Sequence, residues 1–161
     1  MPTSHSSLDD ARVVELLHAY LAAEYRWQHK GGWHDIIIGL PTPGLELAFP
    51  QATTFGAMSA WNPLSIERGR DQNRIADEAL HEALAAGGHA FLPAFASARN
   101  RSWREPSWLV FGMDSGEFDH LSRRFGQLGT LWWKPGEPVR LRMDACKPGG
   151  LADEPYVDWL K

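Results

Sequence analysis

Apolar residues in the first part of the chain recur every three or four positions. They fall on one stripe of a helix: Val13, Leu16, Leu17, Tyr20, Leu21 and Tyr25. Ser7 and Asp9-Asp10 precede this stripe and supply a capping side chain and negative charge for a first turn. Gly31-Gly32 follows it and favours a stop. The pattern predicts an N-terminal helix over residues 7–30, after a frayed start at residues 1–6.

Shorter apolar and β-branched runs follow along the chain. They predict strands over residues 34–39, 54–61, 89–95, 107–113, 130–133 and 139–143. The alternation from Val139 to Met143 is typical of a half-exposed edge strand. Helical spacing predicts helices from Ser65 to the Gly87-Gly88 stop and from Asp114 to about Phe125. The segment Pro41-Thr42-Pro43-Gly44 leads either into a short helix, which we favour, or into a hairpin turn.

The order of these elements indicates the fold class. Between residues 54 and 133 a strand and a helix are followed by two strands, a helix and a strand. Two crossover units of this kind predict an α+β fold with a ferredoxin-like βαββαβ core and both helices on one face of the sheet. The N-terminal helix and the tail at 134–161, with its additional edge strand, are the available cover for the other face. No linker divides the chain, so we expect a single domain over residues 1–161 with its α+β core at 33–133.

Composition narrows the functional classes. The 161 residues carry a formal net charge of −4, which argues against general nucleic-acid binding. Cys146 is the single cysteine of the sequence, so no internal disulfide forms. There is no apolar run of about 18 residues that would span a membrane. The first residues show neither a basic nor an apolar region typical of a signal peptide, so we expect a cytoplasmic protein.

Several short motifs resemble those of a known bacterial family, the domain-of-unknown-function family 3293. They are Ser59-Ala-Trp-Asn-Pro63, Ser65, Asn73, Leu92-Pro-Ala94, Glu105-Pro-Ser-Trp108, Gly112 and Arg124-Phe-Gly-Gln127. The resemblance covers most of residues 13–133. The chain has Ser59 where the family pattern has threonine, and an arginine-rich segment at 98–102 where the pattern has glycine and aspartate. The family name implies no activity, so the resemblance indicates positions and no chemistry.

A first polar cluster lies where the strand at 54–61 ends and the next helix is expected to begin. It comprises Trp61, Asn62, Ser65, Arg68, Arg70 and Asn73. One interpretation is structural: Asn62 ends the strand in a turn, Ser65 caps the helix and Asn73 is exposed. The other is a polar cradle for a small anionic or amide-bearing ligand, because free backbone N–H groups point outward at a helix start.

A second polar cluster consists of Trp103, Glu105, Ser107 and Gln127. In a ferredoxin-like sheet the strand that begins near Glu105 runs antiparallel to the strand that ends near Asn62. Both clusters would then share one rim. Glu105 is a candidate general base beside Arg104, and the alternative is a structural carboxylate that bonds loop amides.

Other candidate chemistry is weaker. The Glu78/His81 and Glu117/His120 pairs imitate a di-iron motif, but they lack the four-helix context that such a site requires, so we expect no metal and no cofactor. No serine has the surroundings of a catalytic nucleophile. The arginine-rich loop at 99–104 could contact nucleic acid, although an internal ion pair or a protein contact is more typical of an acidic protein.

The sequence therefore favours a ligand-binding or accessory module whose rim site comprises Trp61, Asn62, Ser65, Asn73, Glu105 and Gln127. The alternative is a hydrolase or transferase acting on a nucleotide-like or phosphate-bearing substrate, with Glu105 as base and Arg104 or Arg70 holding phosphate. A third alternative is a nucleic-acid or protein partner that binds through the 99–104 loop. The identity of a small-molecule or protein partner and the oligomeric state do not follow from the sequence.

Overall fold

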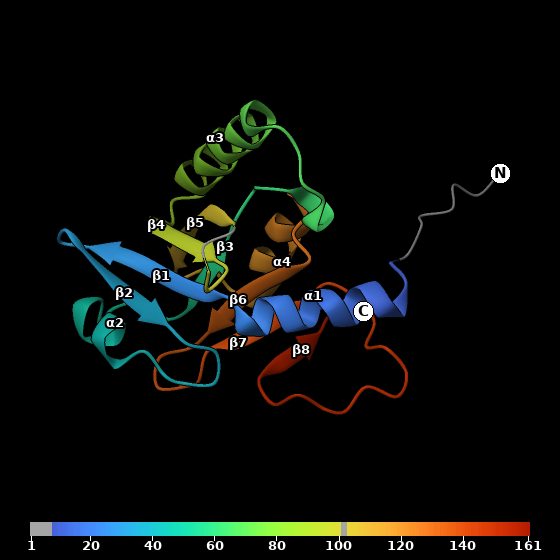
Figure 1. Ribbon diagram of the computed structural model, residues 1–161. Helices are drawn as coiled ribbons and strands as arrows, with labels where there is room; N and C mark the ends of the chain where they lie inside the picture. Colours follow the sequence, from blue (N-terminus) through green and yellow to red (C-terminus); the bar gives the residue numbers. More distant parts are fainter. Residues whose placement is uncertain (1–7, 101–102) are drawn as a thin grey trace.

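The computed structural model describes residues 8–100 and 103–161 (Figure 1). Its helices are α1 (Asp10–Ala22), α2 (Pro43–Ala48), the 3-10 turn η1 (Pro63–Ser65), α3 (Arg70–Ala86) and α4 (Ser115–Arg124). Its strands are β1 (Glu24–His29), β2 (Gly32–Ile36), β3 (Phe55–Met58), β4 (Ala90–Ser97), β5 (Arg104–Phe111), β6 (Gly129–Trp133), β7 (Arg140–Met143) and β8 (Val157–Trp159). The expected frayed start at 1–6, the cap at Ser7 and Arg101 lie outside the described residues.

The strands form one sheet in the order β2-β1-β4-β5-β3-β6-β7-β8. Neighbouring strands are antiparallel throughout, except that β8 runs parallel to β7. The mixture of helices with this sheet confirms the α+β class. No helix among the described residues is both long and apolar enough to cross a membrane.

Each face of the sheet has its own apolar core, because side chains alternate along a strand. On one face Met58 and Val110 pack with Leu80 of α3 and Phe118 of α4. On the other face Phe55, Leu109 and Leu131 pack with Leu17 of α1 and Leu45 of α2. Helices α3 and α4 therefore cover one side, whereas α1 and α2 lie on the other (Figure 1).

The sheet curves until the segment after its edge strand β2 meets the segment before β7, the strand next to the other edge. Ile38, just after β2, forms an isolated parallel bridge with Val139, just before β7. The backbone N–H of Gly39 donates to the Val139 carbonyl at 2.9 Å, and the Val139 N–H donates to the Leu40 carbonyl at 3.0 Å. The face that carries α1 and α2 is consequently concave.

Side-chain size decreases along this concave face on the three strands β5, β3 and β6. The first row is Phe111, Phe55 and Trp133, the second is Leu109, Ala57 and Leu131, and Ser107 of β5 and Gly129 of β6 come next. Large aromatic rings fill one end of the concave face. The small side chains at the other end leave space, and the functional candidates lie there.

The predicted helix over 7–30 is wrong in its second half. Helix α1 ends at Ala22, and Tyr25 belongs to the hairpin of β1 and β2 instead of the helical stripe. The hairpin turn uses Lys30 and Gly31, both with positive φ (49° and 75°), so glycine serves here as a turn residue. Trp27 is 4% exposed in β1, and burial against the sheet favours the strand.

Two further expectations need correction. Ser65 does not begin the long helix: it ends η1, and α3 starts at Arg70 after an extended stretch. Strand β7 is not an edge strand, because β8 from the tail pairs with it. The helix at Pro43–Ala48 and the cap at Asp114, whose carboxylate accepts from the Glu117 N–H at 2.8 Å, are confirmed.

Candidate functional site

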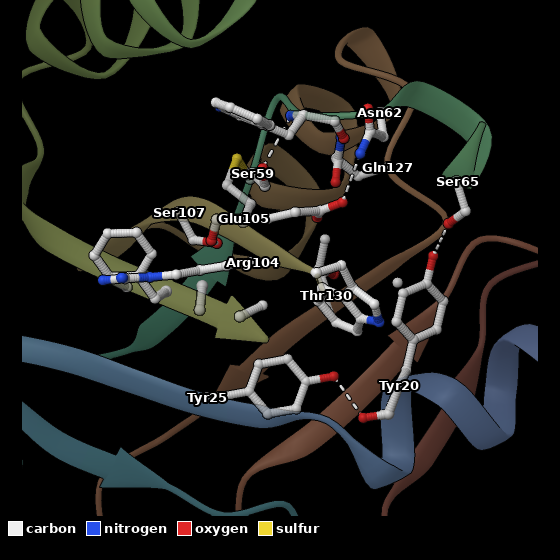
Figure 2. A pocket seen from close by; sticks show the side chains of 18 of the residues that line it. Tyr20, Tyr25, Ser59, Asn62, Ser65, Arg104, Glu105, Ser107, Gln127 and Thr130 are labelled. Carbon is white, nitrogen blue, oxygen red and sulfur yellow. Dashed lines mark hydrogen bonds between the residues drawn. The ribbon is translucent and has the colours of Figure 1, made fainter. Parts of the chain in front are cut away.

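A cavity of about 650 Å³ occupies the end of the concave face that small side chains leave open (Figure 2). Helix α1 and the strands β1, β3, β4, β5 and β6 contribute to its walls. Every residue expected at the site lines it: Trp61, Asn62, Ser65, Arg70, Asn73, Trp103, Arg104, Glu105, Ser107 and Gln127. The structure thus brings the two polar clusters together at one cavity. Their role in binding stays a prediction.

The closest link between the clusters joins Asn62 to Glu105. The Asn62 Nδ2 donates to Glu105 Oε1 at 3.0 Å, across 43 positions of sequence (Figure 2). Asn62 follows β3, and Glu105 is the second residue of β5, which pairs antiparallel with β3. The end of one strand and the beginning of its neighbour therefore meet at one edge of the sheet.

The Asn62 side chain is fixed by Asn73 and Arg68. Its Oδ1 accepts from Asn73 Nδ2 at 2.9 Å and from the Arg68 backbone N–H at 3.1 Å. In return, Asn73 Oδ1 accepts from the Asn62 backbone N–H at 2.9 Å and from Arg68 Nε at 2.7 Å. Asn73 is 2% exposed, so the interpretation of Asn73 as an exposed residue is wrong. Asn73 and Arg68 position Asn62, and Asn62 presents its amide to the cavity.

The turn after β3 has an unusual backbone. Asn62, Leu64 and Ser65 all have positive φ (46°, 57° and 56°), a conformation that costs a non-glycine residue roughly 1 kcal/mol or more. Gln127 Nε2 donates to the Trp61 carbonyl at 3.1 Å. The carbonyl of Gly126, the residue before Gln127, accepts from the Leu64 N–H at 2.7 Å. The segment after α4 therefore holds the turn in place.

Ser59 is committed to the same turn. Its hydroxyl donates to the Pro106 carbonyl at 2.9 Å and accepts from the Trp61 N–H at 2.9 Å. A hydroxyl with both functions engaged is poorly suited to act as a nucleophile. The structure instead gives Ser59 a supporting role that joins the end of β3 to β5.

Glu105 is the carboxylate of greatest interest in the cavity. Burial raises its pKa above the ordinary glutamate value, and the hydrogen bond from Asn62 offsets this only in part. Within the described part of the chain Glu105 forms no ion pair. The expected partner, Arg104, places its guanidinium 3.9 Å from the centre of the Phe95 ring.

Two tyrosines form a wall of the cavity that the sequence did not assign to the site. The Tyr25 hydroxyl donates to the Tyr20 carbonyl at 2.5 Å, and the Tyr20 hydroxyl shares a hydrogen bond with Ser65 (Figure 2). Burial raises the pKa of both phenols, and the nearby Glu105 adds to the shift. The sequence pattern places both tyrosines on one helical stripe, where apolar spacing gives no sign of a cavity wall.

Several hydrogen-bonding groups of the cavity lining have spare capacity. The Trp61 Nε1–H is buried and has no partner among the described residues. Thr130 is 5% exposed, and its hydroxyl makes no hydrogen bond within the same residues. Ser107 makes one long bond of 3.4 Å to the Glu105 carbonyl. Of these groups, the Ser107 hydroxyl lies on the same face of β5 as Glu105 and can bond a molecule inside the cavity.

The arginines near the site are employed in different ways. Arg26 forms ion pairs with Glu24 and Asp35, and Arg99 donates to the Ala22 carbonyl at 3.2 Å. Arg70 is exposed at the start of α3 and forms no ion pair in the described structure. Because Arg99 bonds the protein's own backbone, a structural role is favoured for the beginning of the 99–104 loop.

Metal-ligand chemistry receives no support from the described residues, in which no group of three or more His, Cys, Asp or Glu side chains lies together. The Glu78/His81 pair does not act as a unit, because His81 packs edge-on against Phe91 and Trp108. Glu117 instead contacts His89 at 3.0 Å. Cys146 is exposed with a free thiol.

Comparison with known families agrees with the motif resemblance. A family model described as "Protein of unknown function (DUF3293)" matches residues 58–129, which confirms the resemblance over that segment. The matched residues run from the end of β3 to the start of β6 and include the turn, Glu105 and Gln127. No curated protein and no solved structure matches the chain.

Proposed function

Because residues 58–129 match the DUF3293 family and its description names no activity, we propose a function from the geometry of the site. The protein binds a small organic molecule in the cavity between α1 and the concave face of the sheet. A volume of about 650 Å³ lies within the range of roughly 300–1,000 Å³ that is typical of small-molecule sites.

The observation that carries this proposal is the Asn62–Glu105 contact at the edge of an unfilled cavity. A protein that needed only a packed core would place larger side chains at Ala57 and Ala94, where the floor is open. It would also leave no carboxylate at a position where burial disfavours its charge. The combination of open space and a desolvated acid is typical of a binding site.

A fragment screen by thermal unfolding tests the binding function. A fragment present at about 100 times its Kd raises the free energy of unfolding by about 2.7 kcal/mol. Ala94 is 3% exposed on the cavity floor, and Ala94→Phe fills the space above it. The exposed Ala90 lies on the same strand outside the cavity, so Ala90→Phe is the matched control.

We expect fragments that stabilise the wild type and Ala90→Phe but not Ala94→Phe. A fragment set that stabilises all three proteins equally would place binding elsewhere and contradict the proposal. A set that stabilises none of them would contradict it as well.

Acid–base catalysis at Glu105 is the second candidate function. A carboxyl whose pKa is raised exchanges a proton more readily near neutral pH, as a general base or acid requires. Arg70 and Arg104 line the same cavity and form no ion pair within the described residues, so they would suit a phosphate-bearing substrate of a hydrolase or transferase. A panel of nucleotides and other phosphate esters tests this function. A substrate that the wild type hydrolyses or transfers and Glu105→Gln does not would support it, and turnover that survives the substitution would oppose it.

A ferredoxin-like topology of the core is also part of the proposal. The four strands from residues 55 to 133 lie in the order β4-β5-β3-β6 with antiparallel neighbours, and the two helices between them pack on one face. This arrangement is the one expected of a βαββαβ unit. It supports an interpretation in which β1, β2, β7 and β8 extend that unit into the curved sheet.

A further inference from the structure

Glu105, one of the two glutamates that line the cavity, lacks a cationic partner within the described residues. Glu105 Oε1 accepts one hydrogen bond, from the neutral amide of Asn62, and no ion pair to Glu105 forms within the described residues. An ionised carboxylate has room for about four hydrogen bonds. A group that brings N–H donors and positive charge would therefore be strongly favoured beside it.

Two arginines of the cavity lining, Arg68 and Arg104, are engaged in contacts that do not involve Glu105. Of the other two, Arg26 pairs with acidic side chains of β1 and β2, and Arg70 forms no ion pair within the described residues. Arg68 donates from Nε to Asn73 and from its Nη2 to the Ala60 carbonyl at 3.1 Å. Arg104 is adjacent in sequence, but its guanidinium lies over Phe95. Side chains alternate between faces along a strand, so Arg104 and Glu105 point to opposite sides of β5. Figure 2 shows Glu105 extending toward Asn62, whereas Arg104 extends away from it.

Aromatic side chains line the same cavity. Tyr20 and Tyr25 come from α1 and β1, and Trp61 and Trp103 come from the segments after β3 and before β5. The faces of aromatic rings attract organic cations, by about 0.5–1 kcal/mol at exposed sites and by about 2 kcal/mol or more when water is excluded. A carboxylate without an ion-pair partner, within aromatic walls, is a combination that suits a protonated organic nitrogen group.

We propose that the ligand of this cavity carries a basic nitrogen group (an amine, an amidine or a guanidine) that pairs with Glu105. This inference rests on the proposed binding function and names the class of ligand. The Ser107 hydroxyl, which makes one long bond of 3.4 Å, remains available for an acceptor elsewhere on the same molecule. The bulk of the ligand lies over the floor of Ala57 and Ala94.

The test compares cationic probes with neutral counterparts of the same shape. Benzamidine, tyramine and 1-butylguanidine are titrated by calorimetry beside the neutral molecules benzamide, 4-hydroxyphenethyl alcohol and 1-butylurea. At least one cationic probe is expected to bind about tenfold more tightly than its neutral counterpart to the wild type. Glu105→Gln keeps the shape and removes the charge, so the preference is expected to fall to within about twofold.

The matched control is Glu82→Gln, which makes the same charge change on the exposed face of α3. It is expected to keep the full preference. A wild type that shows no preference for any cationic probe overturns the inference, and so does a preference that survives in Glu105→Gln. A third outcome separates the two proposals. If Ala94→Phe abolishes fragment binding but the wild type does not prefer cationic over neutral probes, the binding function is supported and only the proposed class of ligand is wrong.

Discussion

At the scale of single residues, Glu105 is an exception to the rule that buried charged groups in proteins are paired. Its carboxyl is partly desolvated, and Asn62 supplies one hydrogen bond where a structural carboxylate usually has several or an ion pair. Sites that act on ligands commonly retain groups that lower stability. The pH dependence of stability measures this cost directly.

The folded protein holds the Glu105 proton at a pH where the unfolded chain has already released it, because burial raises the folded-state pKa. The folded state then binds more protons, so this group lowers the free energy of unfolding as pH rises above the ordinary glutamate value. Glu105→Gln is expected to raise the free energy of unfolding by about 1 kcal/mol at pH 7–8 and to match the wild type near pH 4.

Urea titrations at both pH values measure this difference. Glu82→Gln, with an exposed carboxylate, should show no such divergence. A Glu105→Gln protein that is less stable than the wild type at pH 8 would mean that the charge is well satisfied, contrary to the structure.

Asn73 carries a second residue-level prediction. Asn73→Ala leaves the Asn62 backbone N–H and the Arg68 Nε without their acceptor in a buried place, so we expect a loss of about 2–3 kcal/mol. Gln72→Ala removes a neighbouring amide from the exposed side of α3 and should change stability by less than about 0.5 kcal/mol. Chemical denaturation of both variants checks the contrast, and equal effects would show that the network does not stabilise the turn.

At the scale of elements, the turn after β3 is held by the segment after α4. Asn62, Leu64 and Ser65 adopt positive φ there. Such strain persists only where contacts with the surrounding structure hold the backbone in place. The Gln127 and Gly126 contacts supply this restraint. They also give a physical reason for the Phe-Gly-Gln string that follows α4.

Gly126→Ala tests the restraint. Its φ of +68° already strains an alanine, and a Cβ there would lie 2.7 Å from the Cβ of Pro63. Gly136 has a similar φ of +80° with nothing within 4 Å, so Gly136→Ala carries the backbone strain without the clash. We expect Gly126→Ala to be less stable than Gly136→Ala by about 1–3 kcal/mol in thermal or urea unfolding. Equal losses in the two variants would contradict tight packing of Pro63 on this glycine.

At the scale of the whole molecule, the cavity results from the gradient of side-chain size along the curved sheet. Bulky rings at Phe55, Phe111 and Trp133 fill one end, and small residues leave the other end open beneath α1. The curvature follows from strands that twist and from the junction of Ile38 with Val139. Neither the gradient nor the junction involves neighbours in sequence.

This distinction explains what the sequence could and could not predict. The polar clusters could be predicted because Asn62 and Glu105 lie at the ends of strands, where polar residues next to an apolar run indicate a candidate site. The hairpin of β1 and β2 was missed because Tyr25 continues the spacing of the preceding helix. Tyr20 was missed as a cavity wall because a side chain facing a void and one facing a core give the same apolar pattern.

The pairing of β8 with β7 was missed for a related reason. Three residues at Val157–Trp159 are too short to show alternation, and their strand exists only because β7 offers a free edge. Long-range partners of this kind leave little local signal, whereas the cap at Asp114 and the helix after it are local and were predicted.

The most direct test of the central claim is a ¹H–¹⁵N NMR titration with the fragments that stabilise the protein. The unpartnered Trp61 indole N–H and the Asn62 side-chain amide report on the cavity, and Trp61→Phe assigns the first of these signals. We predict that both signals shift in a saturable way in the wild type and stay fixed in Ala94→Phe. Saturable shifts confined to residues outside the cavity, or fixed Trp61 and Asn62 signals at saturating fragment, would contradict a binding site at this edge of the sheet.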